Sequence, residues 1–184
     1  NGYDIVALPD GRFAIAGDRR EPFGGSYDDD FWLFVVEGSG DLVWSKTYGG
    51  RNSDYGHSLV YMGNDGFTFG GSTGSFGSGM LDFWLLRTNI RGDSLWSCSF
   101  GGRSAEGIND IAATSDGGYI LTGNSYTFGP GSSDIWLVKT GRDPLAIYSP
   151  DEDFQISTFD LFTPYPNPFN STTTISYSLP QTSN

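Results

Sequence analysis

The chain has very little of the chemistry that most enzymes and metal centres use. Its 184 residues include one histidine, His57, and one cysteine, Cys98. A single histidine nearly excludes histidine-based catalytic triads and multi-histidine metal sites. A single cysteine allows no disulfide within the chain, so cysteine usage does not indicate a compartment.

Basic residues are also scarce, with 10 Lys and Arg against 22 Asp and Glu, a net charge of −12. Such a surface repels phosphate backbones and anionic lipids, so neither nucleic acid nor a membrane surface is expected as a partner. No apolar run approaches the ~20 residues of a membrane-spanning helix. The sequence begins at Asn1 without a signal peptide, and we expect a processed N-terminus or a piece of a longer chain.

Amphipathic helical patterns are missing too, whereas turn-forming and aromatic residues are abundant. Aromatic residues make up 16% of the chain, and glycines number 27. Aromatic side chains favour pleated surfaces, and glycine adopts the positive φ that tight turns need. The composition therefore predicts an all-β protein of short strands.

The body of the chain repeats with a period of about 52 residues, which is the main organising feature. One marker is Asp, then an aromatic residue or Ile, then Trp-Leu, and it contains Trp32, Trp84 and Trp136. A second marker, "LVWS" and then "SLWS", contains Trp44 and Trp96. A third is a turn followed by a strand: "DGRFAIAG", "NDGFTFGG" and "DGGYILTG". All three markers stay in phase.

The pattern of each unit predicts four short strands. In the first unit they lie at about residues 3–8, 12–16, 31–36 and 42–47. Asp-Gly or Asn-Asp-Gly joins the first two strands as a hairpin. Four antiparallel strands per unit of this length are typical of a β-propeller blade. We therefore expect residues 1–148 to form three four-stranded, propeller-like blades.

The repeated tryptophans are expected to fill the space between neighbouring blades. Trp32, Trp84 and Trp136 recur in the third strand, and Trp44 and Trp96 recur in the fourth, where the third unit has Tyr148. A sugar-stacking role is the alternative. Core packing explains better why one position within a strand is repeated in every unit.

The third unit loses the pattern at its end, where Asp151-Glu152-Asp153 stands in place of a Gly-Gly pair. A terminal blade that stacks on no following blade has this character. Because closed propellers use about four to eight blades, we expect further blades upstream of residue 1. The uncovered blade faces should make the isolated chain self-associate.

The segment "DGGYILTG…SDIWLVKT" (116–140) resembles the Gly/Trp-rich propeller repeats of secreted and surface proteins from Bacteroidetes-like bacteria. The resemblance extends over residues 1–148. It implies an extracellular protein and supports the propeller interpretation. The acidic segment 149–158 follows and is expected to be a linker.

Residues 159–184 resemble the beginning of the C-terminal sorting domain that the type IX secretion system recognises. The motif consists of Tyr165, Pro166, Asn167, Pro168, Phe169 and Asn170. "TTISYSLP" (173–180) continues the match. The two prolines stiffen the turn, and the alternation that follows fits a half-buried strand. The resemblance implies the first strand of a truncated Ig-like domain, type IX machinery as a partner, and secretion or attachment at the outer cell surface.

Other polar groups are interpreted as structural, and no catalytic, cofactor-binding or metal-binding residue is predicted. His57 is expected to line a central channel, at a position where the other units have Tyr3 and Asn109. Cys98 is expected to be inert, and the Gly/Ser-rich stretch 70–79 lacks the Lys-Ser/Thr of a phosphate loop.

Three groups of carboxylates are the remaining candidates: the acidic runs 28–30 and 151–153, and the pair Asp4 and Asp110. The runs lack calcium-loop spacing. For the pair, a structural role is favoured over the two-carboxylate chemistry of glycosidases.

Two function classes remain from the sequence. One is a secreted or cell-surface propeller that acts as a binding or scaffold module, with a glycan or a protein as ligand and no catalysis in this segment. The other is the C-terminal part of a secreted peptidase or glycosidase whose catalytic domain lies upstream. The sequence upstream of residue 1 would distinguish them, because further blades favour the first class.

Overall fold

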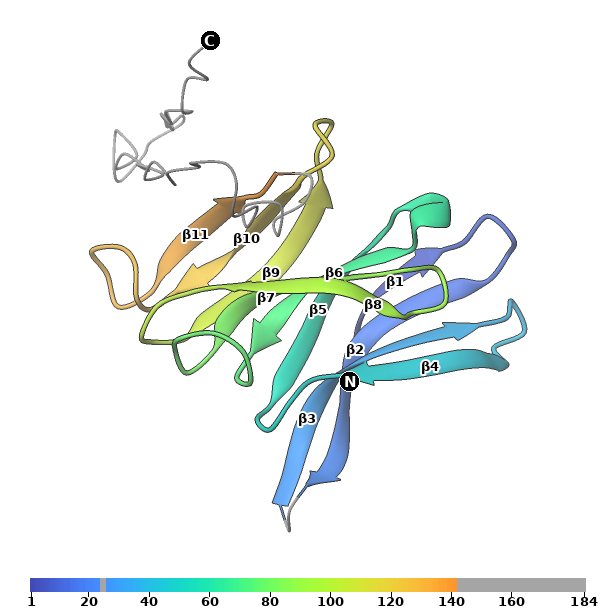
Figure 1. The fold of residues 1–184 in the computed structure, drawn as a ribbon, viewed down its shortest axis with the longest axis horizontal. Helices are drawn as coiled ribbons and strands as arrows, with labels where there is room; N and C mark the ends of the chain where they lie inside the picture. Colours follow the sequence, from blue (N-terminus) through green and yellow to red (C-terminus); the bar gives the residue numbers. More distant parts are fainter. Residues whose placement is uncertain (24–25, 142–184) are drawn as a thin grey trace, which may run out of the picture. The chain divides into compact units, whose positions relative to one another are not determined.

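A computed structural model describes residues 1–23 and 26–141, which are strands for most of their length (Figure 1). The strands are β1 (Gly2–Ala7), β2 (Phe13–Phe23), β3 (Ser26–Val36), β4 (Leu42–Tyr48), β5 (Asp54–Tyr61), β6 (Phe67–Thr73), β7 (Asp82–Thr88), β8 (Ser94–Phe100), β9 (Glu106–Ala113), β10 (Tyr119–Ser125) and β11 (Asp134–Lys139). Within these ranges the only helix is the short 3-10 turn η1 (Gly63–Asp65). The all-β prediction is confirmed for this part of the chain.

The strands form three antiparallel sheets, each in chain order. The first sheet is β1-β2-β3-β4, the second is β5-β6-β7-β8, and the third consists of β9, β10 and β11. Each unit of the repeat thus forms one up-and-down sheet. The fourth strand predicted for the third unit, with Tyr148, lies outside the described residues.

The pairing register is the same in all three sheets. In each sheet the third-strand tryptophan is opposite a glycine of the second strand: Trp32 opposite Gly17, Trp84 opposite Gly71, and Trp136 opposite Gly123. The period seen in the sequence is therefore kept in the strand pairing, and residues at matching positions can be compared directly between sheets.

Two of the predicted hairpin turns have the expected backbone conformation. Gly11 has φ 88° and donates its N–H to the Leu8 carbonyl at 3.0 Å. Gly117 has φ 84° and donates to the Thr114 carbonyl at 2.9 Å. Only glycine adopts this φ without strain, so the Asp-Gly pairs set the ends of these hairpins.

The hairpin of β2 and β3 is longer than predicted. The expected strands ended at residue 16 and began at residue 31, but pairing continues to Phe23 and Ser26. Arg20 is opposite Asp29 in this extension, with Arg20 Nε 3.7 Å from Asp29 Oδ1. Opposite charges across a strand pair favour continued pairing, whereas the corresponding loop of the second unit is rich in Gly and Ser.

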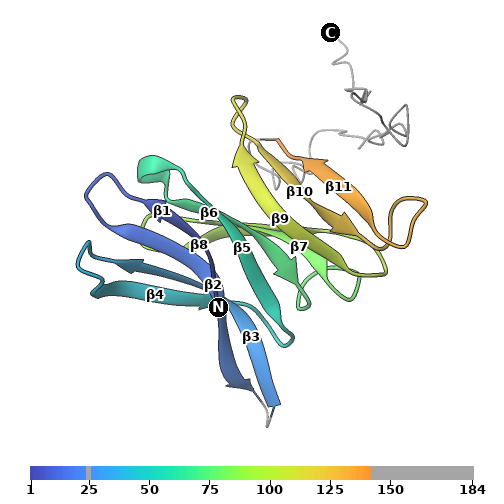
Figure 2. The same cartoon turned by 180° about the vertical axis from the view of Figure 1, so that it is seen from behind.

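Figure 2 shows the three sheets from behind. Two apolar clusters join them, one between the first and second sheets and one between the second and third. In the second and third sheets, we call the face that is directed toward the preceding sheet the front face and the opposite face the back face. In the first sheet, the front face is the one that carries the residues at matching register. The same contacts recur at both junctions. The ring pairs are Phe31 with Trp84 at 6.3 Å, Phe83 with Trp136 at 4.7 Å, Trp44 with Phe67 at 6.2 Å, and Trp96 with Tyr119 at 6.3 Å.

Close approach at the first junction depends on Gly56, in β5. A Cβ atom at Gly56 would lie 1.8 Å from the Phe31 ring. Gly56→Ala must therefore displace the ring or the strand, and we expect a loss of about 1–3 kcal/mol in the free energy of unfolding. Urea denaturation measures this loss. Gly2→Ala, where the nearest atom is 3.8 Å away, is the control and should change stability little; equal effects of the two substitutions would contradict the packing described.

Candidate functional site

The first strands of the three sheets carry a row of polar side chains, and these strands are neighbours. β5 contacts both β1 and β9. Tyr3 in β1, His57 in β5 and Asn109 in β9 hold the positions that the sequence predicted to line a channel. This row brings together side chains from all three units, so it is the candidate ligand-binding site.

Side-chain oxygens at the next position join these strands. Asp4 Oδ2 accepts the N–H of Leu59 at 2.7 Å, and Ser58 Oγ accepts the N–H of Ile111 at 3.3 Å. Ser58 also donates its hydroxyl to Asp110 Oδ1 at 2.7 Å. Asp4 and Ser58 occupy matching positions, so at each junction a side-chain oxygen accepts a backbone N–H of the following sheet.

His57 is fixed by contacts on both sides. Its Nδ1 lies 2.5 Å from the carbonyl oxygen of Ile108. A carbonyl can only accept, so Nδ1 carries the proton, and in the neutral ring Nε2 is left as an acceptor. The edge of the ring meets Tyr3, with centroids 5.1 Å apart and an interplanar angle of 67°. Partial burial and, secondarily, the Asp18 carboxylate raise the pKa of Tyr3.

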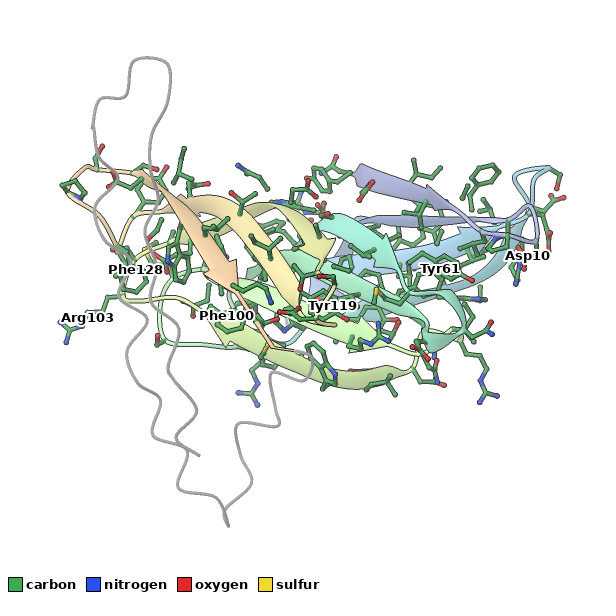
Figure 3. All side chains as sticks on the ribbon, turned by 90° about the horizontal axis from the view of Figure 1, so that it is seen from above. Asp10, Tyr61, Phe100, Arg103, Tyr119 and Phe128 are labelled. Carbon is green, nitrogen blue, oxygen red and sulfur yellow. The ribbon has the colours of Figure 1, made fainter. Side chains whose placement is uncertain are left out.

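A second pair of repeated acids, which the sequence analysis did not single out, lies at the starts of β5 and β9. Asp54 Oδ2 accepts the N–H of Gly50 at 2.9 Å, and Glu106 Oε2 accepts the N–H of Gly102 at 2.9 Å. Both carboxylates are fully buried. Arg103, next to Gly102, is exposed and points away from the strands (Figure 3). The two carboxylates thus accept hydrogen bonds from the backbone of the Gly-Gly turns.

Hydrogen bonds also set the pKa of Glu106. Burial alone would raise it, but donation from Gly102, Thr127 and Ser125 outweighs burial and lowers the pKa below its ordinary value of 4.5. Ser125 Oγ and the Thr127 N–H reach Oε1 at 3.0 and 3.2 Å. The spacing of 52 residues between Asp54 and Glu106 is the sequence signal that could have identified this pair. The signal is easy to overlook because the residue changes from Asp to Glu.

Two aspartates of the Trp-Leu marker, Asp82 and Asp134, accept hydrogen bonds from the loops before their strands. Asp82 Oδ2 accepts the N–H groups of Ser78 and Gly79 at 2.7 and 3.2 Å. Asp134 Oδ2 accepts the N–H of Gly131 at 2.8 Å. Asp82 and Asp134 are the first residues of β7 and β11 and share this role, whereas Asp30, the matching residue of the first unit, lies inside the longer strand β3.

The acidic run 28–30 is held by polar partners. Asp28 Oδ1 accepts the Ser53 hydroxyl at 2.7 Å, and Asp29 pairs with Arg20. Within residues 1–23 and 26–141, no three His, Cys, Asp or Glu side chains converge as metal ligands would. The second run, 151–153, lies outside the described residues.

Four of the five tryptophans lie at the junctions between sheets. Trp84 is buried in the cluster between the first two sheets, against which Trp44 packs. Trp96 and Trp136 pack in the same way against the cluster between the second and third sheets. Trp32 is on the front face of the first sheet, where it stacks on Phe34 with centroids 4.1 Å apart.

The remaining sequence candidates are ordinary parts of the sheets. Cys98 is half-buried in β8, opposite Leu85. The stretch 70–79 runs from β6 into a loop that leads to the strand β7, whereas a phosphate loop leads into a helix. The sorting-motif residues 165–170 lie outside the described residues.

Comparison with protein families and with curated proteins finds no match. In the part of the chain that the structure describes, no helix is long and apolar enough to cross a membrane.

Proposed function

We propose that the chain belongs to a secreted or cell-surface β-propeller module that binds a ligand or serves as a scaffold, and that the bacterial type IX secretion system exports it. The observation that carries the proposal is the segment "YPNPFNSTTTISYSLP" at 165–180. It follows a repetitive all-β body and an acidic linker, as a C-terminal sorting domain would. The net charge of −12 suits a protein that avoids nucleic acid and anionic membranes.

The propeller arrangement is supported by the stacking of the sheets. The first and second sheets each pack their back face on the front face of the next sheet, with the same aromatic pairs at both junctions. The first strands lie together, as they do around the axis of a propeller. Continued stacking of this kind would close into a ring and leave the row of Tyr3, His57 and Asn109 around a central channel.

This arrangement favours binding over catalysis. The side chain of Asp4 is engaged in joining two sheets, and the Nδ1 proton of His57 is donated to a backbone carbonyl. The ligand class that fits a polar, partly aromatic channel is a glycan or a protein loop. The alternative is the C-terminal propeller of a secreted hydrolase, which would place the catalytic groups in another domain.

Export can be tested with a periplasmic reporter in a host that has the type IX machinery. We expect the complete C-terminal region of the parent gene, from residue 159 onward, to bring the reporter to the cell surface. Residues 159–184 alone should leave it in the periplasm, because one strand has no sheet to pair with. Surface proteolysis and cell fractionation measure the two outcomes.

Two substitutions sharpen the export experiment. Pro168→Ala together with Phe169→Ala removes the stiff turn and its anchor and should abolish export of the complete fusion. Ser171→Ala, next to the motif, should leave export unchanged. If the complete C-terminal region fails to export the reporter, the resemblance is only one of turn chemistry and the proposed localisation is wrong.

A further inference from the structure

The front face of the first sheet is apolar although no sheet covers it among the described residues. Ile5, Ile15 and Phe34 are opposite one another in adjacent strands and therefore share this face. Trp32 stacks on Phe34 there. Ile5 remains 60% exposed.

The same positions are buried in the other two sheets. In the second sheet, the residues at matching register are Leu59, Phe69, Leu86 and Trp84, all of which are buried. In the third sheet they are Ile111, Leu121, Val138 and Trp136, all of which belong to or pack against the second cluster. Leu59, the counterpart of Ile5, is only 4% exposed. The front face of the first sheet thus has the composition of a covered face.

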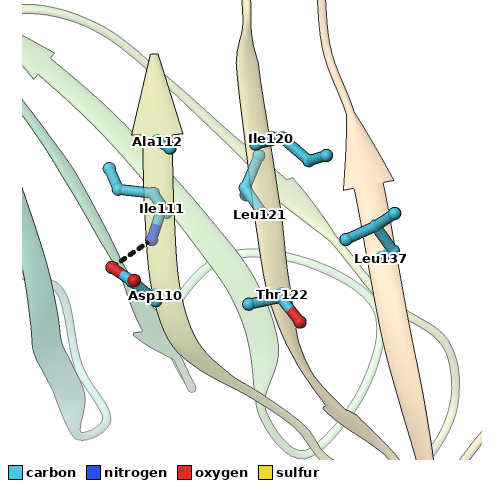
Figure 4. A pocket seen from close by; sticks show the side chains of 7 residues that line it. All are labelled: Asp110, Ile111, Ala112, Ile120, Leu121, Thr122 and Leu137. Carbon is cyan, nitrogen blue, oxygen red and sulfur yellow. Dashed lines mark hydrogen bonds between the residues drawn. The ribbon is translucent and has the colours of Figure 1, made fainter. Parts of the chain in front are cut away.

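What covers the matching faces is the back face of the preceding sheet. Phe31 and Leu33 of the first sheet and Phe83 and Leu85 of the second supply this contact, and all four are buried. The third sheet has Ile135 and Leu137 at these positions, and they are 87% and 40% exposed. Leu137 also lines a shallow pocket on this back face, with Ile120 and Thr122 (Figure 4).

The same back face also carries a candidate hydrogen-bond acceptor, Asp110. Asp110 occupies the position at which Asp4 and Ser58 accept a backbone N–H of the following sheet. Its Oδ1 accepts the Ser58 hydroxyl. It also accepts the N–H of Ile111, the bond that is dashed in Figure 4. No hydrogen bond to Asp110 Oδ2 occurs within the described ranges. The backbone position that donates in the other junctions corresponds to Ile5 of the first sheet.

We propose that the front face of the first sheet binds the back face of the third sheet of a second copy of this chain. This head-to-tail contact repeats the two junctions within the chain, with Ile135 and Leu137 meeting Trp32 and Phe34. The N–H of Ile5 donates to Asp4 Oδ1 at 2.8 Å in its own chain. Asp110 Oδ2 of the other copy accepts the same N–H as a second acceptor, as the N–H of Ile111 is shared between Asp110 and Ser58. Because the two faces differ, the contact is heterologous, and the assembly grows until it closes into a ring or continues as a filament.

The test is self-association of the 184-residue chain in sedimentation velocity, from low to high micromolar concentration. We expect concentration-dependent species larger than the monomer, favoured by added salt because each copy carries a charge of −12. Ile5→Glu on the front face and Ile135→Glu on the back face should each weaken association by about tenfold or more. Both residues are exposed, so circular dichroism and the melting temperature should stay as in the parent chain.

Mixing the two variants distinguishes head-to-tail contact from every other mode. Each variant alone keeps one intact face and should associate about tenfold or more weakly than the parent chain, but an equimolar mixture should form a 1:1 heterodimer. Met80→Glu, at a residue that is 75% exposed and outside both faces, should associate like the parent chain. A parent chain that stays monomeric, or a mixture that forms no heterodimer, overturns the proposal. Loss of association in Ile5→Glu alone would indicate a front-to-front dimer and overturn it equally.

Discussion

Phe31→Ala is expected to lower the free energy of unfolding by about 3–5 kcal/mol. The Phe31 ring is buried, and its centroid lies 4.7 Å from that of Phe69 and 6.3 Å from that of Trp84. Both partners belong to the second sheet, so the substitution opens a cavity at the junction. The rigid strands around it can collapse only in part. Equilibrium urea denaturation, followed by tryptophan fluorescence, measures the change.

The neighbouring residue supplies a matched comparison. Trp32 is larger than Phe31 but is half-buried on the opposite face, with Phe34 as its stacking partner. Trp32→Ala should therefore cost roughly half as much as Phe31→Ala or less, since less apolar area returns to water. The denaturation should be measured at low protein concentration, where the proposed association between copies does not bury Trp32. An equal cost would mean that the front face of the first sheet is covered within the monomer.

The strand order and most of the strand positions could be predicted from the sequence because their signals are local and repeated. Glycine is required where Gly11 and Gly117 adopt positive φ, and alternation of apolar residues sets which side of a strand is buried. The phase of Trp32, Trp84 and Trp136 carried over directly into the strand register. A period of 52 residues left little freedom for a different arrangement of the strands.

The polar junctions could not be predicted because they depend on distances between sheets. Asp54 and Glu106 differ in side-chain length, yet each reaches the N–H of a Gly-Gly turn. The role of Asp4 required knowing that Leu59, 55 residues away, presents its N–H at 2.7 Å. The requirement for glycine at position 56 could not be predicted either, because it depends on the close approach of the Phe31 ring from another sheet.

Glu106→Gln is expected to destabilise the fold by about 1–3 kcal/mol at neutral pH. The carboxylate accepts the N–H of Gly102 on Oε2 and the N–H of Thr127 on Oε1. An amide has only one oxygen, so one of these backbone donors would face an NH₂ group in a buried site. The Ser125 hydroxyl can reorient to accept, but a backbone N–H cannot. Asp54→Asn should act in the same way at the first junction.

The destabilisation should fade as the solution becomes acidic. Because the folded-state pKa of Glu106 is lower than its ordinary value of 4.5, its stabilising contribution is fully present above that value and is lost as pH falls through the folded-state pKa. The difference between the parent chain and Glu106→Gln should thus shrink when urea denaturation is repeated at progressively lower pH from about 4.5 downward. Glu37→Gln, at an exposed position, controls for the removal of one negative charge. A gap between parent and Glu106→Gln that stays constant or widens in acid would show that the hydrogen bonds of the ionised carboxylate do not hold this junction together.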